Sequence, residues 1–120
     1  MSLRPPRAIA PRSADRAQPI VDTLQAEIAE EKAATLARLT RTFEHALAHW
    51  HAAEAEVEAE AERGDASERR RQRAFDAAAR ALWHFVVQRE ACGLRNTEAM
   101  LREYNVPSAL RLRMGAVRRG

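Results

Sequence analysis

The sequence predicts an all-α fold, in which a long antiparallel helical hairpin is followed by two short C-terminal helices. Three observations support this prediction. No Gly or Pro occurs between Ile20 and Arg63, Gly64 then interrupts the pattern, and large apolar residues recur at helical spacing on both sides of it. We expect residues 20–115 to form a single helical domain, completed as a helical bundle in a dimer.

The segment before this domain has a different composition. Residues 1–19 hold four of the five prolines together with four arginines. Proline fixes φ and removes a backbone donor, so the segment is expected to be a disordered Pro/Arg-rich tail.

The sequence shows no targeting or membrane segment. No apolar run follows the basic start of the chain, so we expect no signal peptide. No stretch reaches the ~18 apolar residues of a membrane span. The expected location is the cytoplasm.

The long helix, from about Ile20 to Arg63, would measure about 65 Å at a rise of ~1.5 Å per residue. Its large apolar residues fall on one stripe at a spacing of seven: Leu36, Phe43, Trp50 and Val57. Such spacing is typical of a buried seam between helices. Upstream, Val21, Leu24 and Ile28 continue an apolar face, which Glu31 and Lys32 interrupt.

Gly64 is expected to end this helix, and Asp65 to Glu68 has the form of a capping box that starts the next one. The second helix should run to about Cys92, with Gly93 and Leu94 forming a Schellman ending. Its expected inner face consists of Phe75, Ala79, Leu82 and Val86, widened by Trp83 and Phe85.

A reversal about residue 65 or 66 predicts which residues of the hairpin face each other. The expected pairs are Val57 with Phe75, Leu47 with Phe85, and Trp50 with Leu82. The acidic run 54–62 would lie across the turn from the arginines of 69–73. Each exposed ion pair contributes less than about 1 kcal/mol, so these charges would set the register more than the stability.

Two short helices should complete the chain. Asn96 is a candidate N-cap for a helix from Thr97 to Tyr104. After a turn at 105–108, a last helix is expected to run from about Ser108 to Met114 and to stop at Gly115. Residues 116–120 would form a flexible basic end.

The second helix would cover only about 40 Å of the first. Residues 20–39 would therefore project, and the short helices could cover part of them through Met100, Leu101, Tyr104, Leu110 and Leu112. Because an exposed apolar stripe usually marks an interface, we expect a symmetric homodimer, or an unidentified protein partner. The candidate self-association interface consists of Val21, Leu24, Ile28 and Leu36.

Metal and thiol chemistry are weakly indicated. His45 and His49 share a helical face, but a zinc site needs three or four ligands, and both histidines should point away from the core. We interpret them as solvated surface residues. Cys92, the single cysteine, lies at a helix C-terminus, which disfavours a thiolate, and is interpreted as a small buried apolar residue.

The alternative function is nucleic-acid binding. Residues 97–114 have the outline of a helix-turn-helix, with Arg102, Arg111 and Arg113 as candidate contacts. The segment departs from that motif because Leu101 stands where a small residue is usual and Asn105, not Gly, holds the turn. The second helix would also be barely two turns long. We do not favour this alternative.

The charge pattern admits an internal explanation. The net charge of +3 divides into +3 for residues 1–19, −6 for 20–64 and +6 for 65–120, so the acidic and basic parts could face each other. The sequence holds no Gly-rich phosphate loop, no Ser-His-Asp arrangement in a plausible context and no paired inner carboxylates. We therefore expect a non-enzymatic interaction or oligomerisation protein without a cofactor.

Part of the sequence resembles a known family. The stretch from Trp83 to Arg95, the tetrapeptide Tyr104-Asn105-Val106-Pro107 and the segment from Leu24 to Ala33 are similar to an uncharacterised family of short alphaproteobacterial proteins, a domain of unknown function. The resemblance covers about residues 20–115. It implies a compact all-helical protein and carries no functional residues with it.

Overall fold

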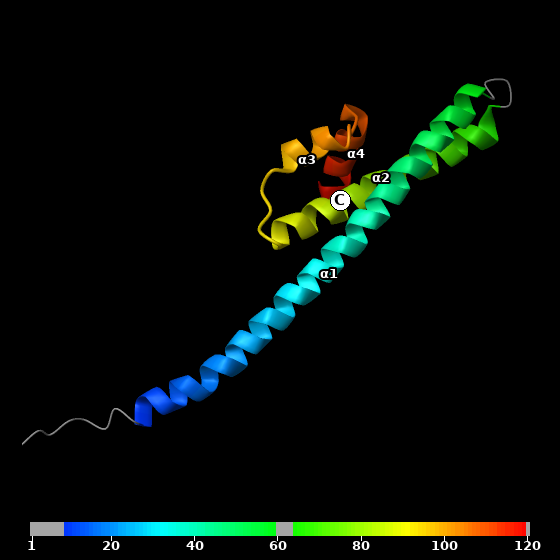
Figure 1. The fold of residues 1–120 in the computed structure, drawn as a ribbon. Helices are drawn as coiled ribbons and strands as arrows, with labels where there is room; N and C mark the ends of the chain where they lie inside the picture. Colours follow the sequence, from blue (N-terminus) through cyan, green and yellow to red (C-terminus); the bar gives the residue numbers. More distant parts are fainter. Residues whose placement is uncertain (1–8, 60–63, 120) are drawn as a thin grey trace, which may run out of the picture.

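The computed structural model describes residues 9–59 and 64–119, with side chains for 17–59 and 64–116. These residues form four helices and no strand: α1 (Ile9–Ala59), α2 (Asp65–Ala91), α3 (Thr97–Glu103) and α4 (Ser108–Arg119). Figure 1 shows α1 and α2 as the two limbs of a hairpin, with α3 and α4 gathered on one side of it. The predicted all-α fold of a hairpin plus two short helices is confirmed.

The long helix begins earlier than expected. α1 contains 51 residues and starts at Ile9, with Pro19 inside it, so the expected start at about Ile20 is wrong. A proline removes one i→i−4 hydrogen bond, and the helix continues through it here. The carbonyl of Pro19 still accepts a bond from Thr23 Oγ1 at 2.8 Å. The first eight residues of the predicted tail lie outside the described part.

The turn forms at the expected place but without the expected cap. Gly64 has a φ of +40°, the left-handed region that favours glycine, and it is the N-cap of α2. No side chain caps this N-terminus, so the predicted capping box is wrong. The Glu68 carboxylate is engaged instead by Arg71 Nε at 3.1 Å. The expected end of the first helix, at 60–63, lies outside the described residues.

The aromatic contacts across the hairpin differ from the predicted pairs by four residues in one case and seven in the other, which is one to two helical turns. Phe85 stacks on Phe43, with ring centroids 5.4 Å apart, where Leu47 was the expected partner. Phe75 meets Trp50, also at 5.4 Å, where Val57 was expected. The residue numbers of these two contacting pairs sum to 128 and 125, whereas each predicted pair sums to 132.

A single core joins the hairpin to the C-terminal helices. Tyr104, at the end of α3, contacts Phe43 edge-on with ring centroids 5.3 Å apart. The largest side chains without exposed surface come from α1, α2 and α4: Phe43, Leu82, Val86 and Leu110. The rest of the core consists of further large apolar side chains and of alanines, which add less buried area: Leu47, Trp50, Ala53, Ala74, Ala78, Ala79, Ala81, Phe85, Met100, Leu101 and Val106.

The C-terminal half follows the predicted elements with two differences. α2 ends in the expected Schellman motif, since Leu94 N–H donates to the Arg89 carbonyl at 2.9 Å and Gly93 has a φ of +80°. Asn96 is the N-cap of α3, but its side chain makes no cap hydrogen bond. α4 continues through Gly115 to Arg119, so the expected stop at Gly115 is wrong. A glycine costs a helix only about 1 kcal/mol, which does not force an end.

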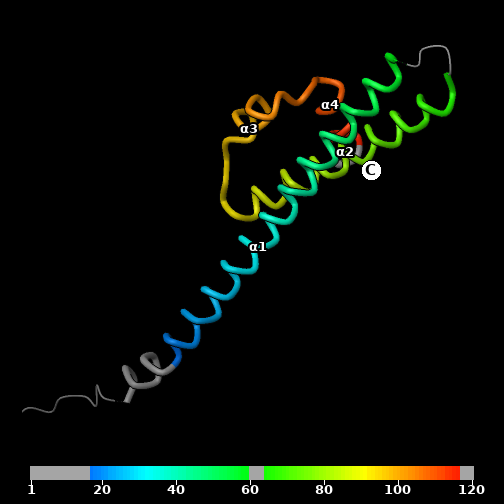
Figure 2. Tube along the Cα trace, turned by 45° about the vertical axis from the view of Figure 1, so that its right-hand side comes forward, coloured from blue at the N-terminus to red at the C-terminus, as the bar shows by residue number. Residues whose placement is uncertain are grey.

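The molecule is strongly elongated, at 98 × 26 × 20 Å. Its radius of gyration is 24.1 Å, whereas a compact chain of this length would have about 14 Å. Figure 2 shows the cause: α1 runs on well beyond the end of α2. We call residues 17–32 of α1 the arm, and the remaining part of the hairpin with α3 and α4 the head.

The short helices do not cover the arm, contrary to expectation. Met100, Leu101 and Leu110 are buried in the head core. Leu112, expected to help cover the projecting stretch, keeps 76% of its surface exposed. The physical reason is that α4 packs against α2, on the hairpin itself, which leaves the arm without a neighbour.

Candidate functional site

The arm presents an unpartnered apolar surface. Val21, Leu24 and Ile28 are 41%, 53% and 54% exposed, so three of the four predicted interface residues lie on the surface. Leu36 differs from them, because it is half-buried and packs against the head core. Leu36 therefore belongs to the place where the arm meets the head.

A groove of about 530 Å³, which we call the junction groove, lies at this meeting point. Gln88 Nε2 donates to the Lys32 carbonyl at 3.3 Å, and the Cys92 thiol lies 3.7 Å from the same oxygen. These contacts hold the end of α2 against α1. The groove is lined by Gln25, Ile28, Ala29, Lys32, Ala33, Leu36, Ala91, Cys92 and Leu94.

Cys92 is only half-buried, so its interpretation as a small buried apolar residue is wrong. It follows the last residue of α2, where the chain turns away from α1, and the turn leaves one side of the thiol open to the junction groove. Leu94, just beyond it, is 40% exposed. The groove is thus apolar, accessible and continuous with the surface of the arm through Ile28.

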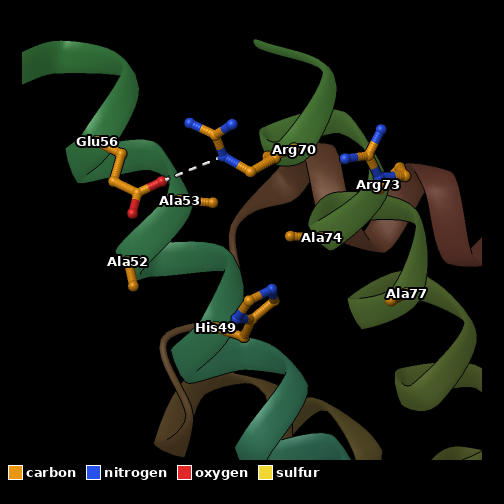
Figure 3. A pocket seen from close by; sticks show the side chains of 8 residues that line it. All are labelled: His49, Ala52, Ala53, Glu56, Arg70, Arg73, Ala74 and Ala77. Atoms are coloured by element: carbon orange, nitrogen blue, oxygen red, sulfur yellow. Dashed lines mark ion pairs between the residues drawn. The ribbon is translucent and has the colours of Figure 1, made fainter. Parts of the chain in front are cut away.

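A second groove, of about 410 Å³, lies between α1 and α2 near the turn. Figure 3 shows its alanine floor, with His49, Glu56, Arg70 and Arg73 around it. Arg70 Nε reaches across to Glu56 Oε2 at 3.6 Å. The one carboxylate of the groove is therefore paired, and small alanine side chains create the hollow. No sequence motif marks this groove; facing alanines on the two helices are the only signal that could have predicted it.

The histidines lie where the helical periodicity predicted. His45 and His49 are exposed, and His51 pairs with Glu54 at 3.6 Å. Among the described residues, no group of three or more His, Cys, Asp or Glu side chains is arranged to hold a metal ion. In the second groove His49 lies with a single carboxylate, that of Glu56, which is paired with Arg70.

Two of the three candidate nucleic-acid contacts are engaged within the chain. Arg111 Nη1 donates to Glu98 Oε2 at 2.9 Å, which links α4 to α3. Arg113 Nε donates to Asp76 Oδ1 at 3.1 Å, which links α4 to α2. Arg102 is exposed. Arg111 and Arg113 thus neutralise acids of this chain and fasten the helix that would have to enter a DNA groove.

Local contacts shift three pKa values. The hydrogen bond from Arg71 lowers the pKa of Glu68, and the same bond raises the pKa of Arg71. Burial in the head raises the pKa of Tyr104, and the nearby Glu44 and Glu103 carboxylates add to this effect. The first two shifts describe a surface pair and the third a packed aromatic residue, so none of them indicates a catalytic group.

Comparisons with models of known families, with curated proteins and with solved structures gave no match. The resemblance to the alphaproteobacterial family therefore stays a prediction. Within the described part of the chain, no helix combines the length and the apolar character that a membrane crossing requires. The arm and the junction groove are the features from which a function can be argued.

Proposed function

We propose that this chain is a small, non-enzymatic helical interaction protein of the cytoplasm that associates with a second copy of itself through the arm. The observation that carries the proposal is the exposure of Val21, Leu24 and Ile28 on a helix that extends past its own domain. A helix with an apolar face normally buries that face against another element. The head is already packed, so a second chain is the natural cover.

The energetics favour a reversible dimer. Full burial of a large aliphatic side chain is worth about 1.5–3 kcal/mol, and each of the three residues has roughly half of this still to gain. Association itself costs an estimated 4–15 kcal/mol in lost freedom. A contact made by a few such side chains from each chain therefore predicts a weak, reversible dimer rather than an obligate one.

Light scattering on the full chain tests this proposal. Across a concentration series that runs from micromolar to about 1 mM, the mass is expected to rise toward twice 13.5 kDa. Ile28→Glu places a charge in the proposed interface and should return the mass to that of the monomer, because an unpaired charge is costly to bury. The matched control is Leu112→Glu, which alters an equally apolar but 76% exposed residue on α4 and should leave the mass unchanged.

A wild-type chain that stays monomeric throughout the series would contradict the proposal. The same is true if Leu112→Glu and Ile28→Glu reduce the mass equally, because the arm would then have no special part in association.

A further inference from the structure

We infer that the hairpin carries a second binding surface, separate from the arm, that takes the phosphate backbone of duplex DNA. This surface, which we call the open face, is formed by one exposed stripe of α1, from Arg38 to Glu56, and one of α2, from Arg70 to His84. It goes beyond the proposed self-association, since none of its residues belongs to the arm. The second groove lies within it.

The two stripes face the same way. The first takes positions 38, 42, 45, 49, 52 and 56, and the second takes positions 70, 73, 77, 80 and 84. Steps of three and four keep residues on one side of a helix, and all eleven residues are exposed. The last three positions of the first stripe and the first three of the second line the same groove. In Figure 3, which looks onto this groove, the C-terminal helices lie behind the hairpin.

Charge on the open face is almost entirely positive. Four arginines and one glutamate give it +3 with the histidines neutral, which equals the net charge of the whole chain. The single carboxylate, that of Glu56, lies 3.6 Å from Arg70 Nε. Other acids of the head lie on the side where the short helices pack: Asp76 pairs with Arg113 of α4, and Glu44 lies near Tyr104.

The arginines are engaged differently on the two sides of the hairpin. Next to the short helices, Arg111 and Arg113 are paired with acids of this chain. On the open face, Arg73 and Arg80 are exposed, and in the described part of the chain neither has an ion-pair partner. Their positions differ by seven, which places them about 10 Å apart along one side of α2. Guanidinium groups are suited to phosphate oxygens because their donors form a planar fork.

The other side chains of the open face favour DNA over other anionic partners. They are small, polar or imidazole groups, so the face lacks the large apolar side chains that a membrane surface or a protein partner would bury. It also lacks Phe, Tyr and Trp, on which unpaired bases would stack. Its single hydroxyl, Thr42 Oγ1, donates to the Arg38 carbonyl at 3.0 Å, whereas duplex RNA is recognised partly through its 2′-hydroxyls.

The size of the face sets the expected strength of binding. The stripe from Arg70 to His84 is about 21 Å long, which corresponds to roughly six base pairs. Contacts of this kind go to the backbone and do not read the bases. If each of the four arginines neutralises one phosphate, the logarithm of the binding constant should fall with the logarithm of salt concentration with a slope of about −3.6.

Fluorescence anisotropy of a labelled 20-base-pair DNA duplex of mixed sequence, titrated with the full-length chain at ~50 mM salt, tests the inference. We expect saturable binding with the salt dependence given above. Arg73→Gln combined with Arg80→Gln should weaken binding at least ~10-fold and make the salt slope shallower by about 2. Both residues are exposed and glutamine is a good helix former, so the fold should persist, and circular dichroism checks this.

The matched control is Arg95→Gln combined with Arg102→Gln. It removes the same number of charges from exposed residues outside the open face, and it should change the affinity for the duplex by less than ~2-fold. Because Arg102 is a candidate contact of the helix-turn-helix alternative, this control also separates the open face from residues 97–114.

Four results would overturn the inference. The first is no binding of the wild-type chain, and the second is an equal loss of affinity in both double variants. The third is binding of single-stranded DNA or duplex RNA as tightly as duplex DNA. The fourth is complete displacement of the duplex by polyglutamate of matched charge, or capture of the chain by phosphatidylserine vesicles without binding of the duplex. Since the arm is not involved, failure here leaves the proposed self-association standing, and a monomer by light scattering leaves this inference standing.

Discussion

Replacing Phe43 with alanine is expected to lower the free energy of unfolding by about 3–5 kcal/mol. The Phe43 side chain has no exposed surface, and its ring contacts Phe85 of α2 and Tyr104 of α3. Removing it leaves a cavity at the point where three helices meet. Because a domain of this size is stable by only about 5–15 kcal/mol, the loss should be obvious in a chemical denaturation curve.

The control for this measurement is Val87→Ala on α2, where 41% of the valine surface is exposed and the expected loss is well below that of Phe43→Ala. Both curves should be recorded at one protein concentration, since association adds to the apparent stability. A loss of less than about 1 kcal/mol for Phe43→Ala would show that the three helices do not pack around this ring.

Leu110→Ala and Leu112→Ala form a matched pair on the same helix. Leu110 is fully buried and Leu112 is 76% exposed, although the two leucines are only two positions apart. We expect Leu110→Ala to cost about 2–5 kcal/mol and Leu112→Ala no more than about 0.5 kcal/mol. Thermal or chemical unfolding of both variants checks this difference.

The leucine pair also tests how α4 is attached. If both substitutions lowered the free energy of unfolding equally, the Leu110 face of α4 would not be the one that packs against α2. A large effect at Leu110 alone would support this docking. It would thereby weaken the interpretation of α4 as a free recognition helix.

The sequence predicted the elements of this fold better than their ends. The spacing of seven from Leu36 to Val57 and the turn at Gly64 were enough to predict the hairpin, because both are local signals. The start at Ile9 was missed because the four prolines of residues 1–19 were taken to indicate a disordered tail, whereas the helix already begins within that segment. The register was missed because helical periodicity repeats every turn, so apolar residues match almost equally well after a shift of one or two turns.

The candidate site shows the same division between local and tertiary information. The exposure of Val21, Leu24 and Ile28 could be predicted, since it follows from the difference in length between two helices. The junction groove could not, because it depends on the exact residue at which α2 leaves α1. The partners of Arg111 and Arg113 were also hidden, since their acids lie 13 and 37 positions away in the chain.

The central claim is that a packed head carries an arm whose apolar face is covered by a second chain. Hydrogen exchange measured over a range of protein concentrations tests this claim most directly. Amides of the head around Leu82 should be strongly protected at every concentration, because their exchange requires global unfolding. Amides of residues 20–30 should exchange fast in dilute protein and become protected as concentration rises. Strong protection of the arm at the lowest concentration, or none at the highest, would contradict the account.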